Sequence, residues 1–259
     1  MINKKKVLIV GIESLIGSHI KRKFSKKFKI YGTSYKKNKL NKKTFFLNLK
    51  DPNLNIINKK KFDILLMCAG KNNLKYCQKN YKKAYKINYI GIKKIFEKAI
   101  KEKIFIVFIS SNVVFSGKKK FYKVSDKPSP NSNYGKLKLK IENFLKKQPK
   151  RSFCILRLTK IYSKKGGIIY NWKRKINLKQ KIHLNCSFKI SPLAVENISK
   201  YLFKIIIKKK NGIYHLSNKK EFTLKEFLNE KIGEYKNLVI NYNSHKWQNK
   251  HNSLKIKLP

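Results

Sequence analysis

The stretch that decides the fold is Lys6-Val7-Leu8-Ile9-Val10-Gly11-Ile12-Glu13-Ser14-Leu15-Ile16-Gly17. An apolar run enters a turn bounded by Gly11 and Gly17, with Ser14 where a third glycine would complete a GxxGxxG spacing. Such a turn directs backbone N–H groups and a helix N-terminus at a pyrophosphate. A glycine turn without a ligand is the alternative, but a strand pattern precedes this turn and a helix pattern follows it. The candidate dinucleotide-binding residues here are Gly11, Ser14, Leu15, Ile16 and Gly17.

Outward from this stretch, apolar runs alternate with longer helical patterns up to about residue 158. The expected strands are Lys6–Val10, Phe28–Gly32, Thr44–Leu47, Phe62–Cys68, Ile104–Ile109 and Phe153–Leu158. The expected helices are Leu15–Ser25, Tyr81–Lys101 and Tyr134–Lys147. This alternation is typical of βαβ units, whose parallel strands are covered on both faces. It predicts an α/β fold with a Rossmann-type, doubly wound parallel sheet.

Beyond Arg157 the alternation loosens, and the pattern favours a small C-terminal α+β lobe. Its expected elements are a helix at Val195–Ile207, a strand at Gly212–Leu216 and a helix at Thr223–Glu230. We therefore divide the chain into a Rossmann domain at residues 1–160 and a small lobe at residues 161–259, interleaved in part with the Rossmann domain.

The end of the second expected strand, residues 32–37, is where the adenosine ribose of a bound dinucleotide would lie. An NAD-selective site would place a carboxylate there, and these residues contain none. Lys36 and Lys37 could instead meet a 2′-phosphate. NADP is therefore favoured over NAD, although lysine is so abundant in this chain that the choice between them stays open.

Ser111, Tyr134 and Lys138 form the sharpest catalytic candidate. Tyr134 and Lys138 are one turn apart in an expected helix, so both side chains project from one face. An ammonium beside a phenol stabilises the phenolate and lowers the pKa of the tyrosine, which prepares it to exchange a proton with a hydroxyl or carbonyl. Ser111 follows the strand Ile104–Ile109, at the sheet edge where α/β folds bind ligands.

The formal net charge of the chain is +53, from 65 Lys+Arg and 12 Asp+Glu. Such a surplus is typical of proteins that bind polyanions. However, only Arg22, Arg151, Arg157 and Arg174 are arginines, and the lysines are scattered along the chain instead of forming one block. Together with abundant Asn and Ile, this pattern indicates an A+T-rich coding sequence. We expect no specific nucleic-acid partner.

Other classes of protein and site are also disfavoured. No apolar run approaches the roughly 20 residues that span a bilayer, so we expect no membrane insertion. Lys4–Val10 imitates the start of a signal peptide, but Gly11 and Glu13 interrupt its apolar part, which predicts a cytoplasmic protein. The cysteines and histidines lack metal-ligand spacing, so no metal site is expected.

Further segments continue the order of these motifs. They are Phe62-Asp63, Met67–Gly70, Asn88, Ile109–Gly117, Asp126 with Pro128 and Pro130, Tyr134–Lys138, Glu142 and Arg157. Together with Val7–Ile20, these segments resemble the extended short-chain dehydrogenase/reductases of the NAD-dependent epimerase/dehydratase superfamily. The similarity is to the dTDP-4-dehydrorhamnose reductase-like, or sugar nucleotide-binding, branch, and it covers nearly the whole chain.

The resemblance implies a Rossmann domain that binds NADP or NAD, a substrate-binding lobe at residues 161–259, and hydride transfer at a sugar carbon. It implies that Tyr134 is the general acid, that Lys138 lowers its pKa and holds the nicotinamide ribose, and that Ser111 orients the carbonyl. A homodimer through the helices 81–101 and 134–147 is also implied, although their lysines repel at low salt. The cofactor contacts then also include Lys36, Asn48, Leu49, Cys68, Ala69, Gly70, Asn88, Tyr134 and Lys138.

The predicted function is NAD(P)-dependent reduction of a nucleotide-activated 4-keto sugar in surface-polysaccharide synthesis. Two departures from the family pattern keep alternatives open. Asn112-Val113 stands where the rhamnose reductases usually have Asp-Tyr, and Val124 stands where a glutamate is frequent. The alternatives are a nucleotide-sugar epimerase or dehydratase of the same family, and a non-catalytic subunit that binds NADP or a nucleotide sugar.

Overall fold

A computed structural model describes residues 4–164, 166–242 and 250–259. Its largest sheet consists of β1 (Lys6–Val10), β2 (Lys29–Ser34), β3 (Thr44–Phe46), β4 (Ile64–Met67), β5 (Phe105–Ser111), β6 (Phe153–Leu158) and β11 (Gly212–Leu216). These seven strands are all parallel and lie in the order β11-β6-β5-β4-β1-β2-β3. The order reverses between β1 and β4, which confirms the predicted doubly wound Rossmann-type sheet.

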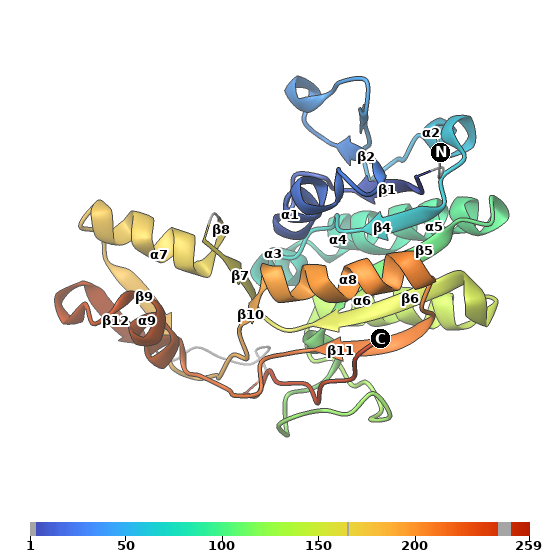
Figure 1. The fold of residues 1–259 in the computed structure, drawn as a ribbon. Coiled ribbons are helices and arrows are strands. Elements are labelled where there is room, and N and C mark those ends of the chain that lie inside the picture. Colours follow the sequence, from blue (N-terminus) through green and yellow to red (C-terminus); the bar gives the residue numbers. More distant parts are fainter. Residues whose placement is uncertain (1–3, 165, 243–249) are drawn as a thin grey trace.

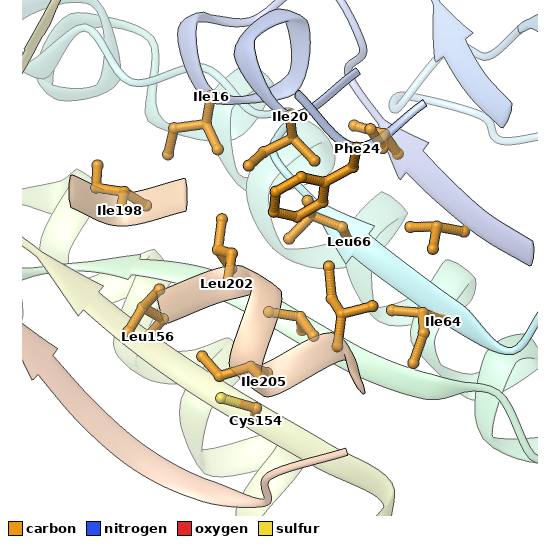
Figure 2. Packing of buried hydrophobic residues seen from close by; sticks show 14 of the residues in the cluster. Ile16, Ile20, Phe24, Ile64, Leu66, Cys154, Leu156, Ile198, Leu202 and Ile205 are labelled. Atoms are coloured by element: carbon orange, nitrogen blue, oxygen red, sulfur yellow. The ribbon is translucent and has the colours of Figure 1, made fainter. Parts of the chain in front are cut away.

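Helices cover both faces of this sheet (Figure 1). One face is covered by α1 (Leu15–Phe24) and α8 (Val195–Lys208), the other by α5 (Ile92–Lys101) and α6 (Asn133–Lys146). Successive side chains of β1 point to opposite faces, so Val7 packs in the first core and Leu8 in the second. Figure 2 shows the first core, where α1 and α8 meet over the sheet. Its labelled side chains are Ile16, Ile20, Phe24, Ile64, Leu66, Cys154, Leu156, Ile198, Leu202 and Ile205.

Two elements that the sequence pattern assigns to the small lobe belong to this large sheet layer instead. β11 pairs in parallel with β6, from Gly212 opposite Cys154 to Leu216 opposite Leu158. α8 carries an apolar face, Ile198, Leu202 and Ile205, that is buried against α1 and the sheet. Periodicity gives an element its type but not its pairing partner, so the sequence pattern leaves open which part of residues 161–259 is interleaved with the Rossmann domain.

A second group of elements lies apart from the large sheet, on the left in Figure 1. It contains α7 (Ile168–Asn177), α9 (Leu224–Ile232), β9 (Ile182–Asn185) and β12 (Val239–Tyr242). These elements share a core of their own, centred on Trp172, Leu184 and Phe227. Short strands, β7 (Ile161–Ser163), β8 (Gly166–Gly167) and β10 (Leu193–Ala194), lie between this group and the large sheet (Figure 1).

The helix expected over residues 81–101 is divided in three. α4 (Tyr81–Tyr85) runs into a π-helical stretch, Lys86–Gly91, before α5 begins. π-helical stretches are rare in proteins, and those that occur often lie at functional sites. This one contains Asn88. The remaining elements are α2 (Asn55–Lys60), α3 (Leu74–Lys79) and short 3₁₀ turns at Lys37–Lys39, Asn112–Val114, Lys150–Ser152 and Lys236–Leu238. No helix in the described residues is long and apolar enough to cross a membrane.

Candidate cofactor and active site

The loop between β1 and α1 is built to bring backbone close to a ligand. Gly11 has φ +85°, a conformation that L side chains rarely adopt. A Cβ at this position would lie 2.8 Å from the Cβ of Ala69. The backbone N–H of Gly11 is held by Thr33 Oγ1 at 3.2 Å. Gly11 is therefore required by both backbone conformation and space, as a phosphate-binding loop demands.

Ser14 caps α1 and does not block this loop. Its Oγ accepts a hydrogen bond from the backbone N–H of Gly17 at 3.0 Å. The side chain is thereby turned into the first helical turn, and the backbone N–H groups of Leu15 and Ile16, which have no acceptor within the helix, face the loop. The substitution of serine for the middle glycine is thus compatible with an anion at this helix N-terminus.

The neighbouring loop after β4 is held by Asn88. Asn88 Oδ1 accepts from the backbone N–H of Lys71 at 2.8 Å, and Asn88 Nδ2 donates to the Lys71 carbonyl at 2.8 Å. These two hydrogen bonds hold the loop, in which Ala69 lies beside Gly11. Burial raises the pKa of the nearby Cys68 thiol to about 12, so Cys68 stays a neutral thiol next to Ser14. Gly11, Ser14, Cys68, Ala69, Gly70 and Asn88 are therefore brought together.

The rim of the site beside β2 contains a carboxylate that the sequence pattern did not reveal. Ser34, the last residue of β2, donates a hydrogen bond from its Oγ to Glu13 Oε2, across 21 residues of chain. Lys36 follows, with its backbone N–H bonded to Ser34 Oγ at 2.9 Å and its side chain exposed. Motif rules look for an acidic residue after the second strand, whereas Glu13 reaches the same place from the loop.

Asn48 and Leu49 follow β3 at the next part of the rim. The side-chain carbonyl of Asn48 accepts from the backbone N–H of Lys50 at 3.0 Å, which closes a local turn. The Leu49 backbone packs directly against Gly91, at the end of the π-helical stretch. Both residues lie at the carboxyl end of a strand in the large sheet. The structure leaves the Asn48 amide nitrogen as the group that could reach a ligand.

The catalytic candidates lie at the carboxyl end of β5. Lys138 Nζ donates to the Ile109 carbonyl at 2.8 Å and lies 5.7 Å from the centre of the Tyr134 ring. Gly135 lets the first turn of α6 lie close to Val113, because a Cβ at position 135 would lie 2.2 Å from the Val113 carbonyl oxygen. Ser111, the last residue of β5, accepts a hydrogen bond from the backbone N–H of Val113 at 3.4 Å. The first turn of α6 is therefore packed against the segment that follows Ser111.

The pKa values at this site differ from the sequence expectation. Burial raises the pKa of Tyr134 above its usual value, where a lowered one was expected. Burial also lowers the pKa of Lys138 to about 8. The Lys138 ammonium is directed at the Ile109 carbonyl, so loss of solvation outweighs its attraction for a phenolate. Tyr134 is consequently a phenol at neutral pH, which is the protonation state of a general acid.

A buried polar network lies beneath these residues. Arg157 Nη2 donates to Glu142 Oε2 at 2.6 Å, and Ser110 Oγ donates to Glu142 Oε1 at 2.6 Å. The side chains of Arg157 and Glu142 are 1% and 0% exposed. Arg157 Nη1 also lies 3.2 Å from His215 Nε2, on β11. Because Glu142 is one turn beyond Lys138, the network fixes α6 to β5, β6 and β11.

His215 is held neutral by its partners. The Tyr122 carbonyl, 3.2 Å from His215 Nδ1, can only accept, and Arg157 can only donate to Nε2. Burial, followed by the charge of Arg157, lowers the pKa of His215 from 6.5 to about 4. An unfolded chain therefore binds a proton below pH 6.5 that the folded chain refuses until about pH 4.

We expect this difference to remove about 3 kcal/mol of folding free energy as the pH falls from 6.5 to 4, because each pKa unit is worth about 1.4 kcal/mol. Urea unfolding at a series of pH values measures it. His215→Gln, whose carbonyl can accept from Arg157, is the matched variant and should lose less stability over this range. Charge repulsion in the acid range is common to both proteins. Equal slopes for the two would contradict the assignment.

Within the part of the chain that the structure describes, no group of three or more His, Cys, Asp or Glu side chains could hold a metal ion. The cluster at the sheet edge instead combines a glycine loop, a helix N-terminus, a phenol, an ammonium and a serine hydroxyl. The turn at Gly11, which has no room for a Cβ, and the capped start of α1 fit a dinucleotide, since the first lets the backbone approach a ligand closely and the second leaves backbone N–H groups without an acceptor in the helix.

Comparisons with known proteins concern the sequence and the fold of the chain as a whole. The family model described as the RmlD substrate binding domain matches residues 5–241. No curated protein matches the chain in a sequence search. Among solved structures, dTDP-4-dehydrorhamnose reductase from Bacillus anthracis str. Ames in complex with NADP is similar, with a TM-score of 0.84 and 23% identity, covering 98% of this chain and 90% of that one.

Two further structures show how widely the fold is shared. A dTDP-4-dehydrorhamnose reductase from Clostridium acetobutylicum has a TM-score of 0.80 and 24% identity, with 96% of this chain and 89% of that chain covered. UDP-glucose 4-epimerase from Thermotoga maritima, solved with UDP-glucose, has a TM-score of 0.84 at 17% identity, with 97% and 90% covered. Reductases and epimerases are thus equally similar in backbone, and the assignment of a reaction has to come from the site.

Proposed function

The chain belongs to the RmlD substrate binding domain family, and from this premise we propose that it is an NAD(P)-dependent oxidoreductase that reduces the keto group of a nucleotide-activated sugar. One observation carries the proposal. Tyr134 and Lys138 lie one turn apart at the start of α6, against the segment that follows Ser111. The glycine loop after β1 lies at the same edge, because the carboxyl ends of parallel strands face one way.

Each residue has a distinct role in this proposal. Tyr134, a phenol at neutral pH, donates its proton to the oxygen of the keto group, and Ser111 orients that oxygen by a hydrogen bond. Lys138 contributes a positive charge that stabilises the tyrosinate left behind. The backbone N–H groups of Leu15 and Ile16 hold the pyrophosphate of NADH or NADPH, which supplies the hydride when bound. The nucleotide sugar would lie between the edge of the large sheet and the group formed by α7, α9, β9 and β12.

A titration of the purified protein with NADH and NADPH at physiological salt tests the cofactor site. We expect saturable changes in nicotinamide fluorescence with the wild-type protein. Gly11→Trp should abolish them, because the side chain would meet Ala69 and would strain a backbone at φ +85°. Lys23→Trp, an equal substitution on the exposed side of α1, controls for the added ring. A wild-type protein that binds neither dinucleotide would contradict the proposed function.

Turnover is then measured with a panel of nucleotide 4-keto sugars, as oxidation of whichever dinucleotide binds in the titration. Consumption of NADH or NADPH with any of them supports a reductase. Interconversion of nucleotide sugars, or loss of water from one of them, without net oxidation of the dinucleotide would make the protein an epimerase or a dehydratase. Binding without any of these reactions would make it a non-catalytic subunit. The panel therefore decides between the three candidates that the substitutions Asn112-Val113 and Val124 left open.

Two further expectations belong to the same proposal. A cytoplasmic location is supported by the four cysteines, all of which are free thiols. Pairing of two copies through the helices at residues 81–101 and 134–147 is a prediction from the family resemblance, and the size of the protein in solution tests it.

A further inference from the structure

The carboxylate of Glu13 lies where the cofactor loop meets the end of β2. Its Oε2 accepts a hydrogen bond from Ser34 Oγ, and Ser34 is itself 4% exposed. Ser34 Oγ also accepts from the backbone N–H of Lys36 at 2.9 Å, which fixes the serine hydroxyl and therefore its proton toward Glu13. Glu13 itself is exposed. A positioned carboxylate thus faces solvent at this corner of the site.

This corner is the part of a dinucleotide-binding sheet that receives the adenosine ribose. In such sheets a carboxylate near the end of the second strand accepts from the ribose 2′-hydroxyl, and a basic side chain there accommodates a 2′-phosphate instead. Residues 32–37 of this chain hold no carboxylate. Glu13 supplies one from the opposite side of the same corner, through its bond to Ser34.

The carboxylate of Glu13 is held in place at this corner, whereas the neighbouring ammonium groups are not. Across the residues that the structure describes, no lysine or arginine forms an ion pair with Glu13, although the chain carries a formal charge of +53. Lys36 and Lys37 are nearby but exposed. An exposed ammonium on a flexible stem loses side-chain entropy when it is held at one contact, and salt screens its charge. The carboxylate of Glu13 is held by its hydrogen bond from Ser34.

We propose that Glu13, held by Ser34, makes this site select NAD over NADP. The inference rests on the proposed function, because it needs a dinucleotide in the loop after β1. The carboxylate accepts a hydrogen bond from the ribose 2′-hydroxyl of NAD. It repels the 2′-phosphate of NADP, which carries a charge of about −1.5 to −2 at neutral pH. The lysines after β2 then act only as a diffuse attraction for either dinucleotide.

The test compares the dissociation constants of NADH and NADPH at physiological salt. Wild-type protein should bind NADH about tenfold more tightly than NADPH. Glu13→Gln keeps the length of the side chain and its acceptor for Ser34 but removes the charge, so NADPH affinity should rise about tenfold while NADH affinity changes less than threefold. A parallel thermal-shift series with ADP-ribose and its 2′-phosphate reports the same preference without the nicotinamide.

Two further variants separate local from general charge effects. Glu97→Gln on α5 makes the same change in net charge away from the corner, and it should leave the ratio of the two constants unchanged. Lys36→Gln tests the opposite assignment, in which this lysine holds a 2′-phosphate. If Lys36→Gln weakens NADPH alone, and Glu13→Gln changes both constants equally, the inference is overturned.

The outcomes also distinguish this inference from the proposed function. A wild-type protein that binds NADPH more tightly than NADH overturns the role of Glu13 while supporting the cofactor site. A protein that binds neither overturns both. A tenfold shift of the ratio in Glu13→Gln, absent in Glu97→Gln, supports the selectivity directly, whatever sugar the protein acts on.

Discussion

Tyr134→Phe is expected to reduce the turnover number for a keto-sugar substrate by about 10² to 10⁴-fold, the usual contribution of a positioned general acid. The change removes one oxygen and keeps the ring, which packs with Cys77 and Leu137. Dissociation constants for NADH and NADPH should therefore stay within about threefold. Burial raises the pKa of Tyr134, so the wild-type phenol holds its proton across the neutral range until the substrate oxygen receives it.

Tyr85→Phe is the matched control for this experiment. Tyr85 is a half-buried tyrosine in α4, with the ammonium of Lys140 at 5.9 Å from its ring centre. Like Tyr134, it has a lysine beside its phenol and packs against the cluster that contains Cys77 and Leu137. Unlike Tyr134, it comes from α4 and not from the first turn of α6. Its substitution should leave turnover within about twofold. Unchanged turnover in Tyr134→Phe, measured with a substrate that the wild type reduces, would rule out the phenol as proton donor.

The strands and helices of the large sheet could be predicted because their patterns are strong. β1, β6 and β11 begin and end at the expected residues, since each is a short apolar run with clear boundaries. The place of β11 could not be predicted, because its five residues carry no mark of pairing with β6. The two- and three-residue strands β7, β8 and β10 have no periodicity to detect.

The structure brings several of the predicted site residues together, but their electrostatics differ from the expectation. The loop residues Gly11 and Ser14 are predicted from spacing, and Asn88 is predicted from the family resemblance. Glu13 was missed because its contact to Ser34 joins two elements across the corner of the sheet. The direction of the Tyr134 pKa shift was wrong because residue spacing gives a neighbour, Lys138, but not the burial that outweighs it.

The buried ion pair between Arg157 and Glu142 fixes α6 to the sheet, and breaking it should be costly. Arg157→Met is expected to lower the free energy of unfolding by about 3 to 5 kcal/mol, because it leaves the Glu142 carboxylate buried and unpaired. Glu142 is 0% exposed and accepts from Ser110 and Arg157. After the substitution only the serine hydroxyl remains as a donor to it. Urea denaturation at neutral pH measures the loss.

The double variant Arg157→Met with Glu142→Met separates the unpaired charge from lost packing. If the penalty comes from the buried carboxylate, removing it should restore most of the lost stability, since apolar side chains of similar volume can replace a buried ion pair. If the double variant is as unstable as the sum of the two single ones, the cost is one of packing, and the charge argument fails. Because Glu142 lies one turn from Lys138, turnover of the double variant then shows whether the ion pair also serves to position that ammonium. A stable double variant that binds the cofactor like the wild type but has a lower turnover number would assign the ion pair that role.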